Sequence, residues 1–150
     1  MARAIMTIGY EQATLPAVLS ALSRAGVGRL VDVRAVAASR RPGFSKRVLA
    51  ASLEEAGIAY THLRALGTPK EGREAARAGR IAEMRRIFAE TLTLPEAEDA
   101  LAALGAMVRA ETCALLCYEA DAATCHRRML TERLAAQTGL PVIDLQAERP

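Results

Sequence analysis

The segment CYEADAATCHRR, residues 117–128, holds most of the side chains that could do chemistry. It contains two of the chain's three cysteines and one of its two histidines, together with two acids and two arginines. A thiol at a strand end before a helix, or beside a histidine, tends to have a lowered pKa. Cys117 and Cys125 are therefore candidate nucleophiles, and Glu119 and His126 are candidate acid–base catalysts. The structural alternative, in which the thiols act as small hydrophobes and His126 is a hydrogen-bonded core residue, stays open.

The same segment lacks the usual spacing of a zinc site. A closed tetrahedral site takes four ligands, commonly including a CxxC pair. Only Cys117, Cys125 and His126 are at hand, and the last two are adjacent. The Cys-x5-Arg spacing of cysteine phosphatases is absent as well, because position 123 is Ala. We therefore predict no metal site and no cofactor.

A second group of functional side chains lies in VDVRAVAASRRPGF, residues 31–44. Arginine is suited to two-point recognition of phosphate or carboxylate, so Arg34 and Arg40 are candidate anion ligands. Asp32 lies inside an apolar strand and needs a partner there. It forms either a structural ion pair with an arginine or a contact that orients a ligand-binding arginine, and both remain open. The candidate binding residues of this segment are Asp32, Arg34, Ser39, Arg40 and Phe44. The alternative for the loop is a solvated turn with the Phe44 ring in the core.

Three further positions supply candidate binding residues. Arg127 is expected in the first turn of a helix, where a cation opposes the helix dipole and a bound anion could offset it. Gly9 and Tyr10 lie at the end of the first strand, where a loop begins. His62 ends the third strand, where it either reaches the site or satisfies a loop carbonyl.

Short apolar runs alternate with helical patterns along the chain. Strands are expected over residues 4–10, 29–34, 58–63, 112–117 and 140–145. Helices are expected between the N-cap Thr14 and Gly26, from Ser45 to Gly57, from Arg73 to Thr91, from Pro95 to Arg109, and from Asp121 to Gln137 with Gly139 closing it. Single helices between strands imply a mostly parallel sheet with helices on both faces.

The sequence thus predicts one three-layer α/β domain over residues 1–145, with strand order 3-2-1-4-5, and a frayed tail over 146–150. In such sheets, ligands bind beyond the carboxyl ends of the strands, where the strand order reverses. That point lies between the first and fourth strands. The segments GYE (9–11), VRAVAASRRPGF (33–44) and CYEADAATCHR (117–127) should meet there.

The composition excludes several classes of protein. Of the 150 residues, 51% are hydrophobic and 25% charged, which is typical of globular proteins. No apolar run has the length of about 20 residues that a membrane helix needs, and three cysteines do not suggest a disulfide scaffold. We expect a cytoplasmic protein without membrane partners, either a monomer or a small homo-oligomer. The net charge of +3 indicates nucleic acid or another anionic partner only weakly.

These motifs together resemble a known family. TIGYE, LVDVRAVAASRRPGF, IAYTHLRALGTPKEGR, LLCYEADAATCHR and VIDL occur in the order, and at about the spacing, of the prokaryotic family called domain of unknown function 488. The resemblance covers nearly the whole chain and implies a small intracellular α/β domain, without supplying a reaction. The positions that match the family motifs are Gly9, Tyr10, Asp32, Arg34, Ser39, Arg40, Phe44, Tyr60, His62, Leu66, Gly67, Cys117, Glu119, Cys125, His126 and Arg127. Tyr10, Thr68 and Ala122 depart from the residues usual in that family, which have His, Gly and Pro.

The expected function is an anion-binding pocket at the carboxyl edge of the sheet. The pocket would belong to an enzyme, a hydrolase or a transferase, that acts on a phosphorylated small molecule, a nucleotide or a nucleic-acid end. His and Glu acid–base chemistry is favoured over a cysteine nucleophile. The alternative is a nucleic-acid-binding or regulatory module that uses the helical segment 71–86, whose simpler interpretation is a solvated Glu/Arg face.

Overall fold

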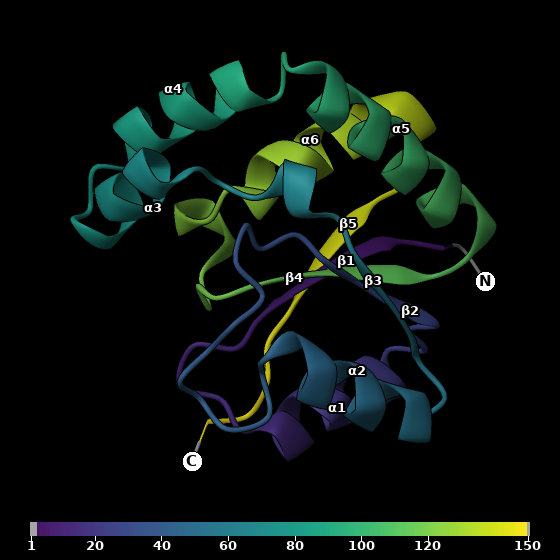
Figure 1. The fold of residues 1–150 in the computed structure, drawn as a ribbon. Coiled ribbons are helices and arrows are strands. Elements are labelled where there is room, and N and C mark those ends of the chain that lie inside the picture. Colours follow the sequence, from purple (N-terminus) through teal and green to yellow (C-terminus); the bar gives the residue numbers. More distant parts are fainter. Residues whose placement is uncertain (1–2, 150) are drawn as a thin grey trace.

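In the computed structural model, which describes residues 3–149, five parallel strands form a central sheet between two layers of helices (Figure 1). The strands are β1 (Ile5–Gly9), β2 (Arg29–Asp32), β3 (Ala59–His62), β4 (Cys113–Cys117) and β5 (Val142–Leu145). The helices are α1 (Leu15–Arg24), α2 (Lys46–Glu55), α3 (Lys70–Arg77), α4 (Ile81–Thr91), α5 (Pro95–Ala110) and α6 (Arg127–Thr138). Short 3-10 turns occur at η1 (Arg64–Leu66) and η2 (Ala122–Thr124). The α/β class with a parallel sheet is confirmed. Within residues 3–149, no helix has the length and apolarity needed to cross a membrane.

The strand order is β3-β2-β4-β1-β5, so the predicted order 3-2-1-4-5 is wrong at its centre. β4 lies between β2 and β1, and Gly9 pairs with Cys117 while Asp32 pairs with Leu116. Both β1 and β4 are buried along their whole length. Apolarity therefore places both strands inside the sheet without deciding which of them is beside β2. The consequence for function is small, because β1 and β4 are still neighbours and their carboxyl ends still meet.

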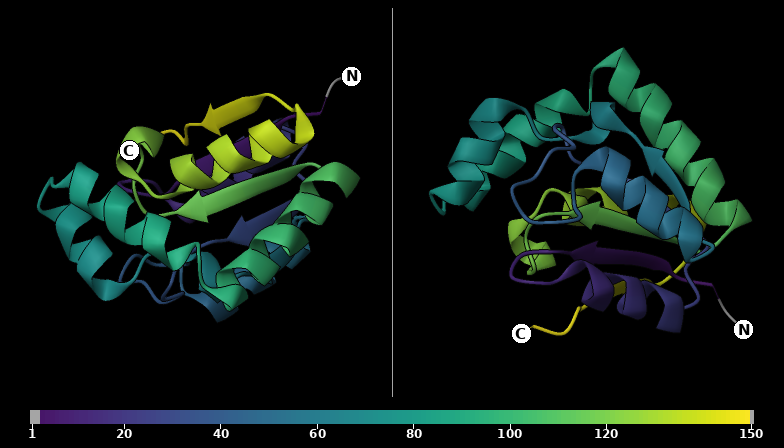
Figure 2. Two further views of the ribbon diagram at one scale, coloured as in Figure 1. Left: turned by 90° about the horizontal axis from the view of Figure 1, so that it is seen from above. Right: turned by 60° about the horizontal axis from the view of Figure 1, so that its bottom comes forward.

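Two hydrophobic layers fix the helices on the sheet. α1 and α2 cover one face, and α5 and α6 cover the other (Figures 1 and 2). Alternating strand residues point to the two layers, so Ile8 packs with the α1/α2 side and Ile5 with the α5/α6 side. Leu22 and Leu104 are fully buried members of the respective helices. The rigid sandwich sets the positions of the loops at the carboxyl edge.

The segment predicted as one helix over 73–91 forms two helices, α3 and α4. Gly79 has φ +80°, a left-handed conformation that glycine adopts without steric cost and that ends α3. The chain then turns and restarts at Ile81. As a result α3 and α4 lie side by side beyond the carboxyl edge of the sheet (Figures 1 and 2).

The helix predicted over Asp121–Gln137 is also interrupted. Asp121 does act as an N-cap, since its carboxylate accepts from the Ala123 amide, but the turn it caps is only η2. Cys125 is extended, with φ −119° and ψ 146°, and His126 is the N-cap residue of α6. Cys125 therefore does not lie in a first helical turn as expected.

The expected helix ends are largely confirmed. The Thr14 hydroxyl accepts from the Ala17 amide, and Gly139 closes α6 in the left-handed region. Ser45 precedes α2, but its hydroxyl bonds Ser39 rather than capping the helix.

The tail is attached to the domain through its side chains. In the tail expected to be frayed over 146–150, Gln146 donates to the Ala120 carbonyl and Arg149 donates to the side chain of Gln12. Pro150 lies outside the described residues.

Candidate functional site

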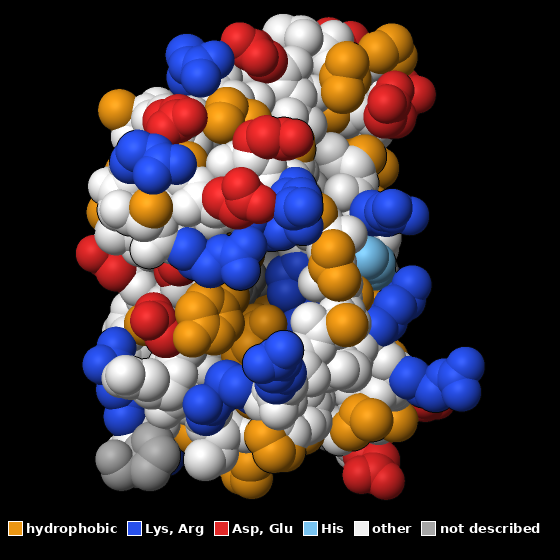
Figure 3. Space-filling model, turned by 60° about the vertical axis from the view of Figure 1, so that its left-hand side comes forward, with side chains coloured by type: hydrophobic (Ala, Val, Ile, Leu, Met, Phe, Trp, Pro, Cys, Tyr) orange, Lys and Arg blue, Asp and Glu red, His pale blue; other side chains and the backbone are white. Residues whose placement is uncertain are grey.

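A cavity of about 390 Å³ opens at the carboxyl edge of the sheet, where β1, β2 and β4 end. Its lining residues are Tyr10, Arg34, Ala35, Val36, Ala38, Ser39, Thr68, Arg73, Ala76, Arg77, Met84, Cys117, Tyr118, Glu119, Thr124 and His126. The loops after β1, β2 and β4 form one side, and α3 with the start of α4 forms the other. A space-filling view from the α3 side shows lysine and arginine side chains around the middle of this face (Figure 3). A cavity of this size can hold a small molecule.

The structure brings some of the candidate site residues to this cavity and leaves others away from it. Those in its lining are Tyr10, Arg34, Ser39, Cys117, Glu119 and His126. Those outside its lining are Gly9, Asp32, Arg40, Phe44, His62, Cys125 and Arg127. Arg40 is exposed, whereas Phe44 is fully buried and stacks on Tyr10 with ring centroids 4.4 Å apart.

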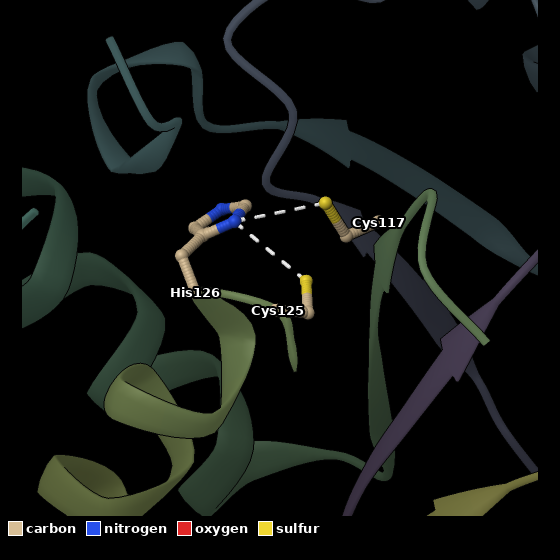
Figure 4. A group of neighbouring side chains, drawn as sticks. All are labelled: Cys117, Cys125 and His126. Carbon is tan, nitrogen blue, oxygen red and sulfur yellow. Dashed lines mark hydrogen bonds between the residues drawn. The ribbon is translucent and has the colours of Figure 1, made fainter. Parts of the chain in front are cut away.

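Three side chains meet at the cavity floor (Figure 4). The Nδ1 atom of His126 lies 3.6 Å from the Cys117 sulfur and 3.7 Å from the Cys125 sulfur. Cys117 comes from the end of β4, while Cys125 and His126 come from the turn into α6. The Glu119 carboxylate lies 3.5 Å from the Cys117 sulfur. Both thiols and the imidazole are buried.

The orientation of the His126 ring is set by its other nitrogen. Nε2 lies 2.8 Å from the Val33 carbonyl oxygen. A carbonyl only accepts, so Nε2 carries a hydrogen and donates it. In the neutral ring, Nδ1 then has a free lone pair that points to the sulfurs. An edge contact with Phe88, at a centroid distance of 4.9 Å, packs against the ring.

Burial and neighbouring charges shift the pKa values of this group. Burial, followed by the negative charge of Cys125, raises the pKa of Glu119 to about 7. Burial opposes ionisation of Cys125, but the Cys117 thiol and the charge of His126 together lower the pKa of Cys125. Burial lowers the pKa of His126. The negative charge of Cys125 and the other neighbouring groups together have a larger effect than burial, so the pKa of His126 is raised overall. The hydrogen bond with Cys125 and burial raise the Cys117 pKa. A negative charge on Cys125 and a positive charge on His126 thus stabilise one another.

Asp32 and Arg34 form an interior ion pair beside this floor. Nη2 of Arg34 lies 2.6 Å from Oδ2 of Asp32 and Nε lies 2.8 Å from Oδ1. Nη1 donates to the Tyr10 hydroxyl and to the Phe44 carbonyl. Burial opposes the charge of Arg34, yet Asp32 outweighs it and raises the Arg34 pKa. These bonds use four of the five guanidinium N–H groups and leave one on Nη2.

Two side chains of β3 support the ion pair. The Tyr60 hydroxyl donates to Oδ2 of Asp32 at 2.6 Å. His62 bonds the Arg34 carbonyl through Nε2 at 2.7 Å. His62 therefore holds the backbone that carries a cavity residue and does not itself line the cavity.

Arg127 has a structural position rather than one in the cavity wall. Its side chain is fully buried, and its Nη1 and Nη2 donate to the carbonyls of Glu119 and Ala120. Its Nε has no hydrogen-bond partner among the described residues. Arg127 was expected to be an anion ligand; in the structure, Nη1 and Nη2 hold the loop after β4, and the side chain does not line the cavity.

Sequence reasoning did not place Arg73 and Arg77 in the site, although both line the cavity. They are four residues apart on α3 and so lie on the same helix face. Arg73 donates to the Thr68 carbonyl, while Arg77 is exposed at the cavity wall. The spacing of the two arginines was a visible signal, but the turn at Gly79 that folds α3 over the sheet edge was not.

The model of the family named domain of unknown function DUF488 matches residues 14–134. The chain belongs to this family. The match spans α1 to α6, including the Asp32–Arg34 pair and the Cys117–Cys125–His126 group of this DUF488 domain. Searches of curated proteins and of solved structures each returned no match.

Proposed function

We propose that the cavity binds an anionic small molecule, a phosphorylated compound or nucleotide or a nucleic-acid end, and that the chain is an enzyme acting on it. One observation carries the proposal: arginines, a buried imidazole and a half-buried carboxyl group line the same opening. Arg77 supplies positive charge and Arg34 a free N–H donor, while Glu119 and His126 lie at the floor. A hydrolase or a transferase is the reaction class that this combination fits.

The anion would contact the α3 side of the cavity first. Arg77 is exposed there, and its only side-chain hydrogen bond among the described residues is to the Arg73 carbonyl at 3.4 Å. Breaking such a long bond costs little, so the guanidinium is free to turn to a ligand. Arg34 is held more rigidly; Asp32 offsets its charge, and it offers the one N–H that its other bonds leave free. A mobile and a fixed guanidinium can together hold two oxygens of a phosphate.

Proton transfer would fall to groups at the floor. Glu119 lies beside Cys117, and His126 contacts both sulfurs. A bound phosphate ester or anhydride placed against this floor would have an acid, an imidazole and a thiol within reach. Glu119 and His126 are the preferred acid–base pair, and Cys117 is the thiol that lines the cavity.

No specific contact favours the nucleic-acid-binding alternative. Much of the positive charge around segment 71–86 is paired with acids. Arg80 bonds Glu83, Arg85 bonds Glu132 and Arg86 bonds Glu90. These pairs reduce the net charge that this helical surface would present to a polyanion.

The test is equilibrium binding of inorganic phosphate and of nucleoside monophosphates by calorimetry. We expect Arg77→Ala to weaken phosphate binding about tenfold, because a charge-assisted bond contributes roughly 1.5 kcal/mol. Arg86→Ala is the matched control on the neighbouring helix; its side chain is exposed and does not line the cavity. Equal affinity in wild type and Arg77→Ala, or no binding by wild type, would contradict the proposal.

A further inference from the structure

We propose that Cys117, Cys125 and His126 bind a divalent, thiophilic metal ion, zinc first, with one coordination position open to the cavity. This inference goes beyond anion binding and does not depend on it. It reverses the prediction from sequence spacing, because the fold brings together three ligand atoms from β4 and from the turn before α6. Those atoms lie within 4.8 Å of one another.

The distances match those of a tetrahedral site. With Zn–S about 2.3 Å and Zn–N about 2.0–2.1 Å, a tetrahedral angle separates sulfur from nitrogen by about 3.6 Å. The two observed sulfur–Nδ1 distances are 3.6 Å and 3.7 Å. The sulfur–nitrogen spacing around Nδ1 is therefore already that of a tetrahedral zinc site, and the ligand atoms all lie within 4.8 Å of one another.

The hydrogen bonding of His126 is that of a metal ligand. Ligating histidines generally donate their other ring N–H to a carbonyl or carboxylate, which fixes the ring and its tautomer. Nε2 of His126 donates to the Val33 carbonyl at 2.8 Å. The lone pair of Nδ1 is thereby turned to the two thiols, as coordination requires.

Charge and ligand type favour the same class of ion. Two thiolates and one neutral imidazole would balance a dication, which removes the cost of burying unpaired charge. Sulfur and imidazole ligands select zinc and related ions over magnesium or calcium. The described residues hold no third thiol at this place, since Cys113 lies at the opposite end of β4.

The fourth position would face the cavity. Cys117 and His126 line the cavity, while Cys125 lies behind them. Three protein ligands plus one exchangeable position is the arrangement of catalytic zinc, whereas closed structural sites use four protein ligands. A water molecule or an oxygen of an anionic substrate fits that position. Nδ1 of His126 would then be a ligand, so acid–base work would fall to Glu119.

Metal titration of the reduced, chelator-treated full chain tests the site. We expect one equivalent of Co²⁺ to bind, with the thiolate charge-transfer absorption and the strong visible bands of tetrahedral cobalt, and Zn²⁺ to displace it. Cys117→Ala, Cys125→Ala and His126→Ala should each weaken Zn²⁺ binding by about 100-fold or more. The third cysteine, at the other end of β4, provides the control Cys113→Ala, which should bind as wild type does.

X-ray absorption on the wild-type zinc complex keeps the test independent of whether the variants fold. Two sulfur ligands with nitrogen or oxygen in the other positions are expected. Absence of a cobalt–thiolate band in folded, reduced protein, or zinc bound by nitrogen and oxygen alone, would overturn the metal site. Because no phosphate is present, failure here leaves the anion proposal standing, and phosphate binding by metal-free protein decides that proposal separately.

Discussion

Two buried guanidinium groups near the site are satisfied in different ways. Arg34 is paired with the Asp32 carboxylate, so the charges offset one another in the interior. Arg127 has no carboxylate partner among the described residues and bonds two backbone carbonyls instead. A buried cation of this kind is costly by itself, and its hydrogen bonds to the two loop carbonyls offset part of that cost, although Gln146 also donates to the Ala120 carbonyl. Arg34 lines the cavity and Arg127 does not, although both are buried arginines. The groups around each side chain decide its role, and the residue type does not.

Arg127→Ala should lower the free energy of unfolding by about 3 kcal/mol, since it leaves a void and removes the donors to two carbonyls. Phosphate affinity of the fraction that remains folded should be unchanged. Arg128→Ala is the control, because its side chain is 38% exposed and its ion pair with Asp144 lies near the surface. That change should cost less than about 1 kcal/mol in urea unfolding. Lost phosphate binding with unchanged stability in Arg127→Ala would restore the ligand role.

Tyr60 gives a prediction that depends on pH. Burial, then the hydrogen bond to Asp32, raise the Tyr60 pKa above its ordinary 10.0. The folded state therefore keeps a proton that the unfolded chain loses near pH 10, so this stabilisation is complete below pH 10 and decreases above it. Tyr60→Phe should cost about 2 kcal/mol near neutral pH, because the hydrogen bond to a charged group is lost.

The difference between wild type and Tyr60→Phe should narrow as the pH rises above 10, measured by denaturant unfolding at each pH. Tyr118→Phe is the control, because the Tyr118 ring is 43% exposed. A gap that stays constant or widens with pH would show that the hydroxyl is not tied to Asp32.

At the scale of elements, the site depends on how closely two loops approach. Gly9 ends β1 and pairs with Cys117 at the end of β4. A Cβ at Gly9 would lie 1.8 Å from the Glu119 carbonyl oxygen, so only glycine lets the loop after β4 cross there. That carbonyl is also an acceptor of Arg127. The position of Glu119 is therefore set by a glycine in another strand.

Gly9→Ala should lower the free energy of unfolding by about 3 kcal/mol, because backbone must move to relieve the clash. It should also weaken zinc binding, since the same loop connects Cys117 to Cys125. Gly28→Ala is the matched control, as its nearest neighbour to an added Cβ is the Thr112 carbonyl oxygen at 3.8 Å. That change should stay within about 0.5 kcal/mol. Similar melting temperatures for the two variants would contradict the close approach.

At the scale of the whole molecule, the cavity unites segments that are far apart in sequence. Tyr10 follows β1, Arg34 follows β2, Arg77 comes from α3 and Glu119 follows β4. A ligand at the floor contacts parts of several elements at once. Binding should therefore stabilise the complete fold rather than one loop.

Zinc at about 100 times its dissociation constant should add about 2.7 kcal/mol to the free energy of unfolding. For a chain of this size, that corresponds to a rise in melting temperature of about 5–10 °C, measured by calorimetry and reversed by a chelator. His126→Ala should show no rise, whereas Cys113→Ala should respond as wild type. Equal responses of these two variants would place the ion elsewhere.

Local patterns in the sequence were enough to predict the helices and strands and most of the reactive side chains. Alternating apolar runs predicted the strands, Thr14 and Gly139 marked helix ends, and the 117–128 segment contained the reactive groups. These features depend on near neighbours along the chain. Two helix breaks were missed. The break at Gly79 had a local signal in the glycine itself, whereas the extended backbone at Cys125 had none.

Four features were decided only by the tertiary structure. β4 lies between β2 and β1, and Arg127 is buried. Arg77 lies in the cavity wall, and the sulfurs of Cys117 and Cys125 lie close to His126. Each depends on crossovers that carry the chain across the sheet, and side-chain periodicity does not determine which strand a crossover passes over. Spacing in the sequence therefore argued against a metal site, while the geometry of the folded chain favours one.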